Sequence, residues 1–197
     1  MRQGEAGSVK VRSWPASLVP AELRAQVVAL QEQAWPSDDP AAAQGVAHDP
    51  ALRPVSLLLV DDGTVVAALD ILSKVVIHRG RRFAASGLST VVTDRERRRQ
   101  GHGRRLVTAA RDALRDGGAD LGIFSCDRPL RPFYESAGWC VLPGAVLVGG
   151  TPKEPFPSDR LDKVVLARFF SARARSCAGW FDRARIELFP GPIDKLW

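Results

Sequence analysis

Apolar residues along this chain gather in short runs that have the lengths of strands. The runs at 55–60 and 64–72 flank the sequence Asp-Asp-Gly, which is typical of a tight hairpin turn. A second pair of runs, at 74–78 and 83–93, flanks the sequence Arg-Gly-Arg. The pattern therefore predicts two antiparallel hairpins in the first half of the chain.

Two other segments carry apolar residues at helical spacing. Residues 20–34 begin with a first-turn proline, and residues 101–116 carry an apolar stripe that ends before Gly117. Both segments are predicted to be helices. The remaining expected elements are strands at 9–14, 121–125, 139–142, 145–149 and 162–171, short helices at 41–47, 129–136 and 174–180, a disordered segment at 1–8 and a proline-rich loop at 151–161.

Length and composition indicate a single α/β (α+β) domain over residues 9–197. The apolar runs are too short to cross a membrane, the polar first ten residues do not resemble a signal peptide, and the three cysteines lack metal-ligand spacing. We therefore expect a cytoplasmic protein without a metal site. The formal net charge of +6 suits an anionic partner, but the motifs of nucleic-acid-binding proteins are missing.

The basic segment that precedes the helix at 101–116 is the most informative part of the sequence. It reads Arg98-Arg99-Gln100-Gly101-His102-Gly103-Arg104, and six arginines lie between Arg95 and Arg105. Glycines let the backbone approach a phosphate, and the free N–H groups and dipole of a helix N-terminus favour negative charge. The spacing is neither that of the dinucleotide fingerprint nor that of the Walker loop. The segment is interpreted as a pyrophosphate site, the alternative being a basic turn that caps a surface helix.

The order of strand, Arg-x-x-Gly-x-Gly, helix, strand and Phe133-Tyr134-Glu135-x-x-Gly138-Trp139 resembles the Gcn5-related N-acetyltransferase (GNAT) superfamily over residues 55–139. The resemblance implies a mixed, mostly antiparallel sheet flanked by helices, with one parallel strand pair. It also implies acetyl-CoA as the cofactor and a small-molecule amine as the acceptor. The tail, with Trp180-Phe181-Asp182 and Ile193-Asp194-Lys195-Leu196-Trp197, is similar to that of the aminoglycoside 2′-N-acetyltransferases.

The resemblance assigns roles to individual residues. Tyr134 matches the tyrosine whose hydroxyl can protonate the CoA thiolate. Asp127 stands where many members carry an asparagine that touches the pantetheine arm. His102 is expected to be a phosphate neighbour rather than a catalyst. The expected cofactor-binding residues are Val91, Val92, Thr93, Arg98, Arg99, Gln100, Gly101, His102, Gly103, Arg104 and Asp127.

The general base is not evident in the sequence. The 2′-N-acetyltransferases use a glutamate where this chain has Ser89, so another carboxylate or a water chain must serve; the candidates are Asp38, Asp39, Asp70, Asp159 and Asp162. An acidic pocket for an aminoglycoside-like substrate is expected from Asp38, Asp39, Asp159, Asp162, Asp194 and the C-terminal carboxylate of Trp197, with Ser89 as a further substrate-binding residue. Cys126 has no neighbouring histidine in the sequence, and we expect a structural role for it rather than an acyl-enzyme.

Three alternatives remain open. The chain can act on a protein or peptide amine, or it can be a sensor that binds acyl-CoA without catalysis. It can also be a polyanion-binding protein, with strongly salt-dependent affinity for nucleic acid. A homodimer is expected from the family resemblance, and a role in antibiotic resistance follows if the acceptor is an aminoglycoside.

Overall fold

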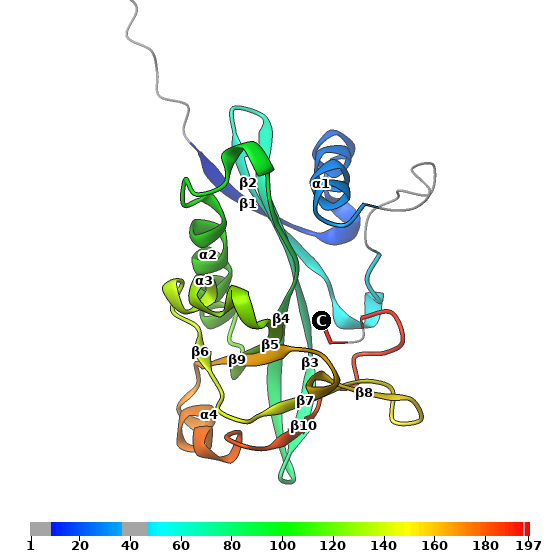
Figure 1. The fold of residues 1–197 in the computed structure, drawn as a ribbon, viewed down its shortest axis with the longest axis vertical. Coiled ribbons are helices and arrows are strands. Elements are labelled where there is room, and N and C mark those ends of the chain that lie inside the picture. Colours follow the sequence, from blue (N-terminus) through cyan, green and yellow to red (C-terminus); the bar gives the residue numbers. More distant parts are fainter. Residues whose placement is uncertain (1–8, 37–46, 195) are drawn as a thin grey trace, which may run out of the picture.

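The main layer of the computed structural model, which describes residues 9–36, 47–194 and 196–197, is a seven-stranded sheet (Figure 1). Its strand order is β1-β2-β3-β4-β5-β9-β6, and all neighbours are antiparallel except β4 and β5. The mixed, mostly antiparallel sheet expected from the sequence is confirmed. The strands are β1 Lys10–Pro15, β2 Val55–Asp61, β3 Thr64–His78, β4 Arg81–Thr93, β5 Leu121–Asp127, β9 Lys163–Phe169 and β6 Cys140–Val141.

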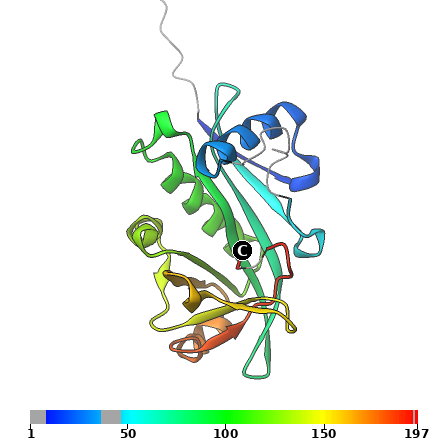
Figure 2. The same cartoon turned by 45° about the vertical axis from the view of Figure 1, so that its right-hand side comes forward.

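Helices cover both faces of this sheet. Helix α1, Ala21–Ala34, lies over one face and α2, His102–Asp116, over the other (Figures 1 and 2). Adjacent β2 residues show why, because Leu58 packs in the cluster under α1 and Leu59 in the larger cluster under α2. The other helices are α3 Arg131–Ser136 and α4 Ala172–Ser176, with 3₁₀ turns η1 Ala16–Leu18, η3 Pro50–Leu52, η4 Arg95–Arg97, η5 Arg128–Leu130, η6 Ser158–Arg160 and η7 Ala178–Trp180.

The two predicted hairpins share one strand. The segments expected as separate strands at 64–72 and 74–78 form the continuous β3, so β2, β3 and β4 make a meander. Ser73 and Lys74 do not interrupt the ladder, because they pair with Ser86 and Ala85 of β4. The Ser73 and Ser86 hydroxyls also lie 2.7 Å apart across the strands, which satisfies the polar groups within the sheet.

The chain after residue 139 differs more from the prediction. The expected strand pair around Pro143-Gly144 is divided between two sheets, because β6 joins the large sheet and the next strand does not. That strand, β7, lies between β10 and β8, and β8 and η6 fall within the predicted loop at 151–161. The bounds of this second sheet are β7 Val146–Gly150, β8 Pro155–Pro157 and β10 Arg185–Glu187.

Some predictions fall outside the described residues. These are the disordered segment at 1–8 and, apart from Ala47, the short helix at 41–47. The helix expected at 174–180 begins earlier, as α4, and ends in η7. Within the described residues, no helix is long and apolar enough to span a membrane.

Candidate active site

The parallel pairing of β4 and β5 is short, and beyond it the two strands no longer pair. Only two pairs join the strands, Ala85 with Leu121 and Ser86 with Gly122. Beyond them, β4 contains a bulge against β3, at which Thr90 adopts a positive φ of 49°. The edge of β4 that faces away from β3 is therefore left without a β5 partner, and its backbone groups are available to a ligand.

A cavity of about 600 Å³ lies between this edge of β4 and the start of α2, and we call it the α2 cavity. Tyr134, the expected general acid, also lines it. Of the expected cofactor residues, those that line the cavity are Val91, Val92, Thr93, Arg98, Arg99, Gly101, His102, Gly103 and Arg104. Two expected cofactor residues, Gln100 and Asp127, are not among the lining residues. The Asp127 carboxylate instead pairs with Lys163 Nζ at 2.6 Å.

The loop that enters α2 has a backbone shape suited to phosphate. Gly101 is the N-cap residue with a φ of 83°, a conformation that favours glycine. The first N–H groups of any helix have no acceptor within the helix, and glycine has no side chain that could accept from them here. A Cβ at Gly103 would lie 2.8 Å from Thr93 Oγ1, so only glycine lets the helix start pack this closely against β4. These features fit a pyrophosphate, which would be held by the backbone N–H groups.

The six arginines around this loop have different roles. Arg97 pairs with Asp61 at 2.6 Å, Arg105 donates to the Val9 carbonyl at 2.6 Å and Arg95 donates to the Gln33 carbonyl. Arg98 donates through Nε to the Thr93 carbonyl at 3.5 Å. Arg99 and Arg104, in contrast, have no side-chain partner among the described residues, and both line the α2 cavity. These two guanidinium groups are therefore the ones available to a bound phosphate.

Tyr134 lies on α3, with its ring packed against Phe124 at a centroid distance of 5.0 Å and against Phe133 at 4.9 Å. Burial raises the pKa of its hydroxyl well above the ordinary value, and the negative charges of Cys126 and Asp127 act in the same direction. The phenol consequently stays protonated at neutral pH and has a proton to donate. Burial also raises the pKa of the Cys126 thiol to about 11, which makes it a poor nucleophile.

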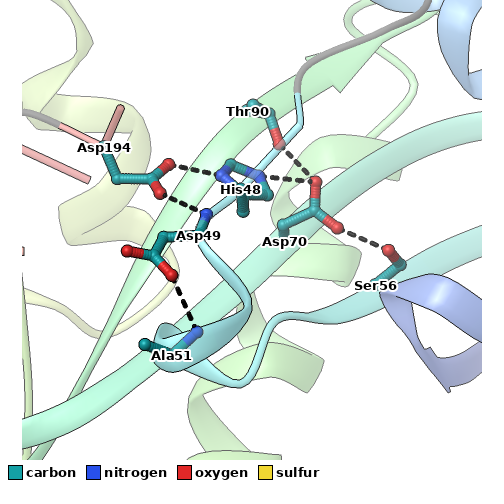
Figure 3. A network of polar contacts seen from close by, with 7 residues as sticks. All are labelled: His48, Asp49, Ala51, Ser56, Asp70, Thr90 and Asp194. Atoms are coloured by element: carbon teal, nitrogen blue, oxygen red, sulfur yellow. Dashed lines mark hydrogen bonds and ion pairs between the residues drawn. The ribbon is translucent and has the colours of Figure 1, made fainter. Parts of the chain in front are cut away.

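A network of buried polar side chains lies beside the bulge of β4 (Figure 3). The Nδ1 atom of His48 is 2.5 Å from Asp194 Oδ1, and its Nε2 atom is 3.2 Å from Asp70 Oδ2. Asp70 also accepts hydrogen bonds from Thr90 Oγ1 at 2.7 Å and from Ser56 Oγ at 2.5 Å. Side chains from a loop, three strands and the C-terminal segment thus converge on one point.

The two carboxylates control the protonation of His48. Burial by itself lowers the pKa of a histidine, but the hydrogen bonds and the negative charges of Asp70 and Asp194 outweigh it. The pKa of His48 is therefore raised above 6.5. Its side chain is 3% exposed, whereas that of Asp70 is 10% exposed, so Asp70 is the more accessible member of the pair.

A second cavity, of about 570 Å³, lies between α1 and the sheet, and we call it the α1 cavity. His48, Ser56 and Asp70 line it. Thr90, which donates to Asp70, directly precedes Val91, which lines the α2 cavity. The β4 bulge therefore contributes to both sides: Thr90 to the network that lines the α1 cavity, and Val91 to the lining of the α2 cavity.

The C-terminal segment reaches into the opening between β4 and β5 (Figures 1 and 2). The indole N–H of Trp197 donates to the Ile123 carbonyl at 2.9 Å, just beyond the last β4–β5 pair. A Cβ at Gly87 would lie 2.3 Å from Trp197 Nε1, so this glycine makes room for the ring. Asp194 of the same segment also accepts from the Asp49 backbone N–H at 2.9 Å.

The structure disperses the acidic pocket expected from the sequence. Asp162 pairs with Arg128 at 2.7 Å and lines neither cavity, and Asp194 is engaged with His48. Ser89 pairs with Asp70 in the β3–β4 ladder, whereas Asp38 and Asp39 lie outside the described residues. Sequence reasoning missed His48, which is distant in sequence from its partners. Asp70 was among the candidate bases, but no sequence signal singled it out.

Comparisons with known proteins agree with this geometry. Residues 18–142 match a family model described as the acetyltransferase (GNAT) domain, while a search of curated proteins gives no significant match. Among solved structures, the GNAT family N-acetyltransferase YhbS from Escherichia coli in complex with CoA has a TM-score of 0.65 at 19% identity, over 95% of this chain and 93% of that one.

Two further structures share the fold at lower scores. An aminoglycoside 6′-N-acetyltransferase complexed with coenzyme A has a TM-score of 0.57 at 15% identity, over 83% of this chain and 98% of that one. An acyl-CoA N-acyltransferase from Pseudomonas aeruginosa has a TM-score of 0.54 at 16% identity, over 82% of this chain and 99% of that one.

The open β4 edge and the glycine-rich helix start together define the fold of an acyl-CoA-dependent N-acyltransferase. The chain belongs to the GNAT acetyltransferase family, whose domain model covers well over half of it. It is an N-acetyltransferase with acetyl-CoA as the acyl donor, and the α2 cavity has the residues to hold that donor.

Proposed function

We propose that this enzyme acetylates a primary amine of a small molecule by direct attack, with Tyr134 as general acid and the Asp70–His48 pair as proton acceptor. One observation carries the proposal: the Asp70–His48 network and Tyr134 line two cavities to which neighbouring residues of the β4 bulge, Thr90 and Val91, contribute. Attack on a thioester requires a proton acceptor on the amine side and a donor on the sulfur side. The arrangement supplies both.

On the amine side, the Asp70–His48 pair can accept the proton that leaves the amine. Above its raised pKa, His48 keeps the Nδ1 hydrogen toward Asp194, and its Nε2 lone pair faces Asp70 Oδ2, so that the two atoms can accept one proton between them. A proton that leaves the amine nitrogen can then be shared between Asp70 Oδ2 and His48 Nε2 before it passes to solvent. The Asp70 carboxylate also attracts the ammonium form of the acceptor into the α1 cavity.

The sulfur side supplies a proton. Bound acetyl-CoA brings an activated acetyl group, whose carbon–sulfur bond breaks as the carbon–nitrogen bond forms. The protonated phenol of Tyr134 can donate to the departing sulfur and recover its proton from solvent. Backbone N–H groups on the open edge of β4 can bind the thioester oxygen, which accumulates negative charge during the attack.

The experiment is to incubate the protein with acetyl-CoA and a panel of primary amines, following thiol release and identifying the N-acetyl product by mass spectrometry. Isothermal titration with acetyl-CoA gives the binding constant separately. Tyr134→Phe should lower kcat about 100-fold and change the acetyl-CoA Kd less than twofold, because the ring and its packing remain. A non-catalytic acyl-CoA sensor predicts instead acetyl-CoA binding without N-acetyl product from any amine.

A further inference from the structure

We propose that the acceptor is a monoamine with an apolar body, and that Arg53 excludes polycationic amines from the α1 cavity. This inference rests on the proposed function, since it specifies the class of amine that reaches the Asp70–His48 pair. It runs against the aminoglycoside-like acceptor expected from the sequence, because an aminoglycoside carries several ammonium groups.

The walls of the α1 cavity are predominantly apolar. The side chains that provide this surface are Val19, Val27, Val28, Pro50, Pro54 and Val55. They come from α1, the preceding turn, the segment around η3 and the start of β2, so they enclose the approach to Asp70 from several directions. Such walls gain free energy by covering the hydrocarbon part of an amine.

The described lining also has little negative charge to offer a polyamine. Asp70 is its single carboxylate, and that group already accepts from Ser56 and Thr90 and faces His48. Asp159 and Asp162, which could have supplied further charge, pair with Arg185 and Arg128 and line neither cavity. One ammonium group can therefore be compensated here, whereas a second finds no carboxylate in the described lining.

Two arginines in the same lining make a second ammonium group unfavourable. Arg24 donates through Nη2 to the carbonyls of Ala16, Ser17 and Val19 at 3.1–3.3 Å, and so holds the turn before α1. Arg53 follows η3 with a φ of 50°, and its guanidinium has no partner among the described residues. Its uncompensated positive charge repels an additional cation, and this repulsion weakens as ionic strength rises.

The test measures kcat/KM with saturating acetyl-CoA for 2-phenylethylamine, spermidine and kanamycin at low and high salt. For the wild-type enzyme, we expect kcat/KM for 2-phenylethylamine to exceed the values for both polyamines at least tenfold. Arg53→Glu should raise kcat/KM for the polyamines about tenfold at low salt, and less at high salt, and by a larger factor than for 2-phenylethylamine. Arg53→Gln, which removes the positive charge without adding a negative one, should give an intermediate increase. This variant keeps the test decisive if the glutamate disturbs the turn.

The matched control is Arg82→Glu, which changes the net charge equally at an exposed position of β4 that lines neither cavity. Its selectivity should equal that of the wild type. A wild-type preference for kanamycin or spermidine overturns the inference and leaves the proposed function intact. Equal effects of Arg53→Glu and Arg82→Glu also overturn the assigned role of Arg53. Acetyl-CoA binding without N-acetyl product from any amine overturns the proposed function, and the inference with it.

Discussion

The α2 cavity and the α1 cavity are both bordered by the bulged part of β4, but they are built in opposite ways. The α2 cavity takes most of its lining from a contiguous stretch of chain, from the end of β4 to the first turn of α2, and the groups proposed to bind phosphate there are backbone N–H groups. The α1 cavity takes its chemistry from side chains far apart in sequence, with His48 and Asp194 separated by 146 positions. A donor common to a family can be bound by backbone geometry, whereas the acceptor side depends on individual side chains.

The largest expected effect is on the acceptor side. Asp70→Asn keeps the size of the side chain but removes the charge and the proton acceptor, so kcat should fall about 100-fold or more. The acetyl-CoA Kd should stay within twofold of the wild-type value, because Asp70 does not line the α2 cavity. Steady-state kinetics and titration calorimetry provide the two numbers.

Asp116→Asn is the matched control for this substitution. Its carboxylate pairs with Arg115 at the surface and lines neither cavity, so both kcat and Kd should change little. A fall in acetyl-CoA affinity that accounts for all of the lost rate in Asp70→Asn would contradict the separation of the two cavities.

A substitution at the donor side should have the converse signature. In Gly103→Ala the new Cβ meets Thr93 Oγ1 at 2.8 Å and Phe133 at 3.3 Å, so the start of α2 has to move away from β4. Acetyl-CoA should bind about tenfold more weakly. Gly179→Ala is the control, because no atom lies within 4 Å of the added Cβ. Unchanged affinity in Gly103→Ala, measured by calorimetry, would mean that the packing of this turn does not set the phosphate site.

The protonation of His48 predicts a pH dependence that belongs to the acceptor side alone. If neutral His48 receives the proton, kcat/KM rises with pH through a pKa above 6.5. Asp194→Asn removes one of the two carboxylates that raise this pKa, so the acid limb should move to lower pH. An acid limb at the same pH in both proteins would exclude His48 as the group responsible.

The same pKa shift predicts a change in stability. Because folding raises the pKa of His48, its stabilising contribution is complete below pH 6.5 and is lost as pH rises through the folded-state pKa. Denaturant unfolding across this range should show that the decrease is smaller in Asp194→Asn than in the wild type.

The smallest expected effect concerns Trp197, which lies in the opening between β4 and β5. Trp197→Phe removes the hydrogen bond to the Ile123 carbonyl, so the free energy of unfolding should fall by about 1–2 kcal/mol. Trp35→Phe is the control, because Trp35 is exposed and should change stability by less than about 0.5 kcal/mol. Equal stabilities of the two variants, measured by urea unfolding, would show that the indole hydrogen bond contributes nothing measurable.

Local signals in the sequence predicted much of the fold and the residues that line the α2 cavity. The Asp-Asp-Gly and Arg-Gly-Arg turns connect strands as expected, and Gly101 and Gly103 lie at the start of α2, as expected for a helix start that binds phosphate. Local prediction failed where a strand changed sheets, as at β6 and β7, and where a short strand such as β10 depends on its neighbours for stability.

The sequence by itself determined the donor side of this enzyme, because turn residues, helix starts and close glycine contacts act over a few neighbouring positions. The tertiary structure alone decided the acceptor side. His48, Asp70 and Asp194 are brought together by tertiary contacts: β3 pairs with β4, and the C-terminal segment packs with Trp197 beside Gly87. The pairing of His48 with two carboxylates, and the pKa that results, are properties of that packing and of no local segment.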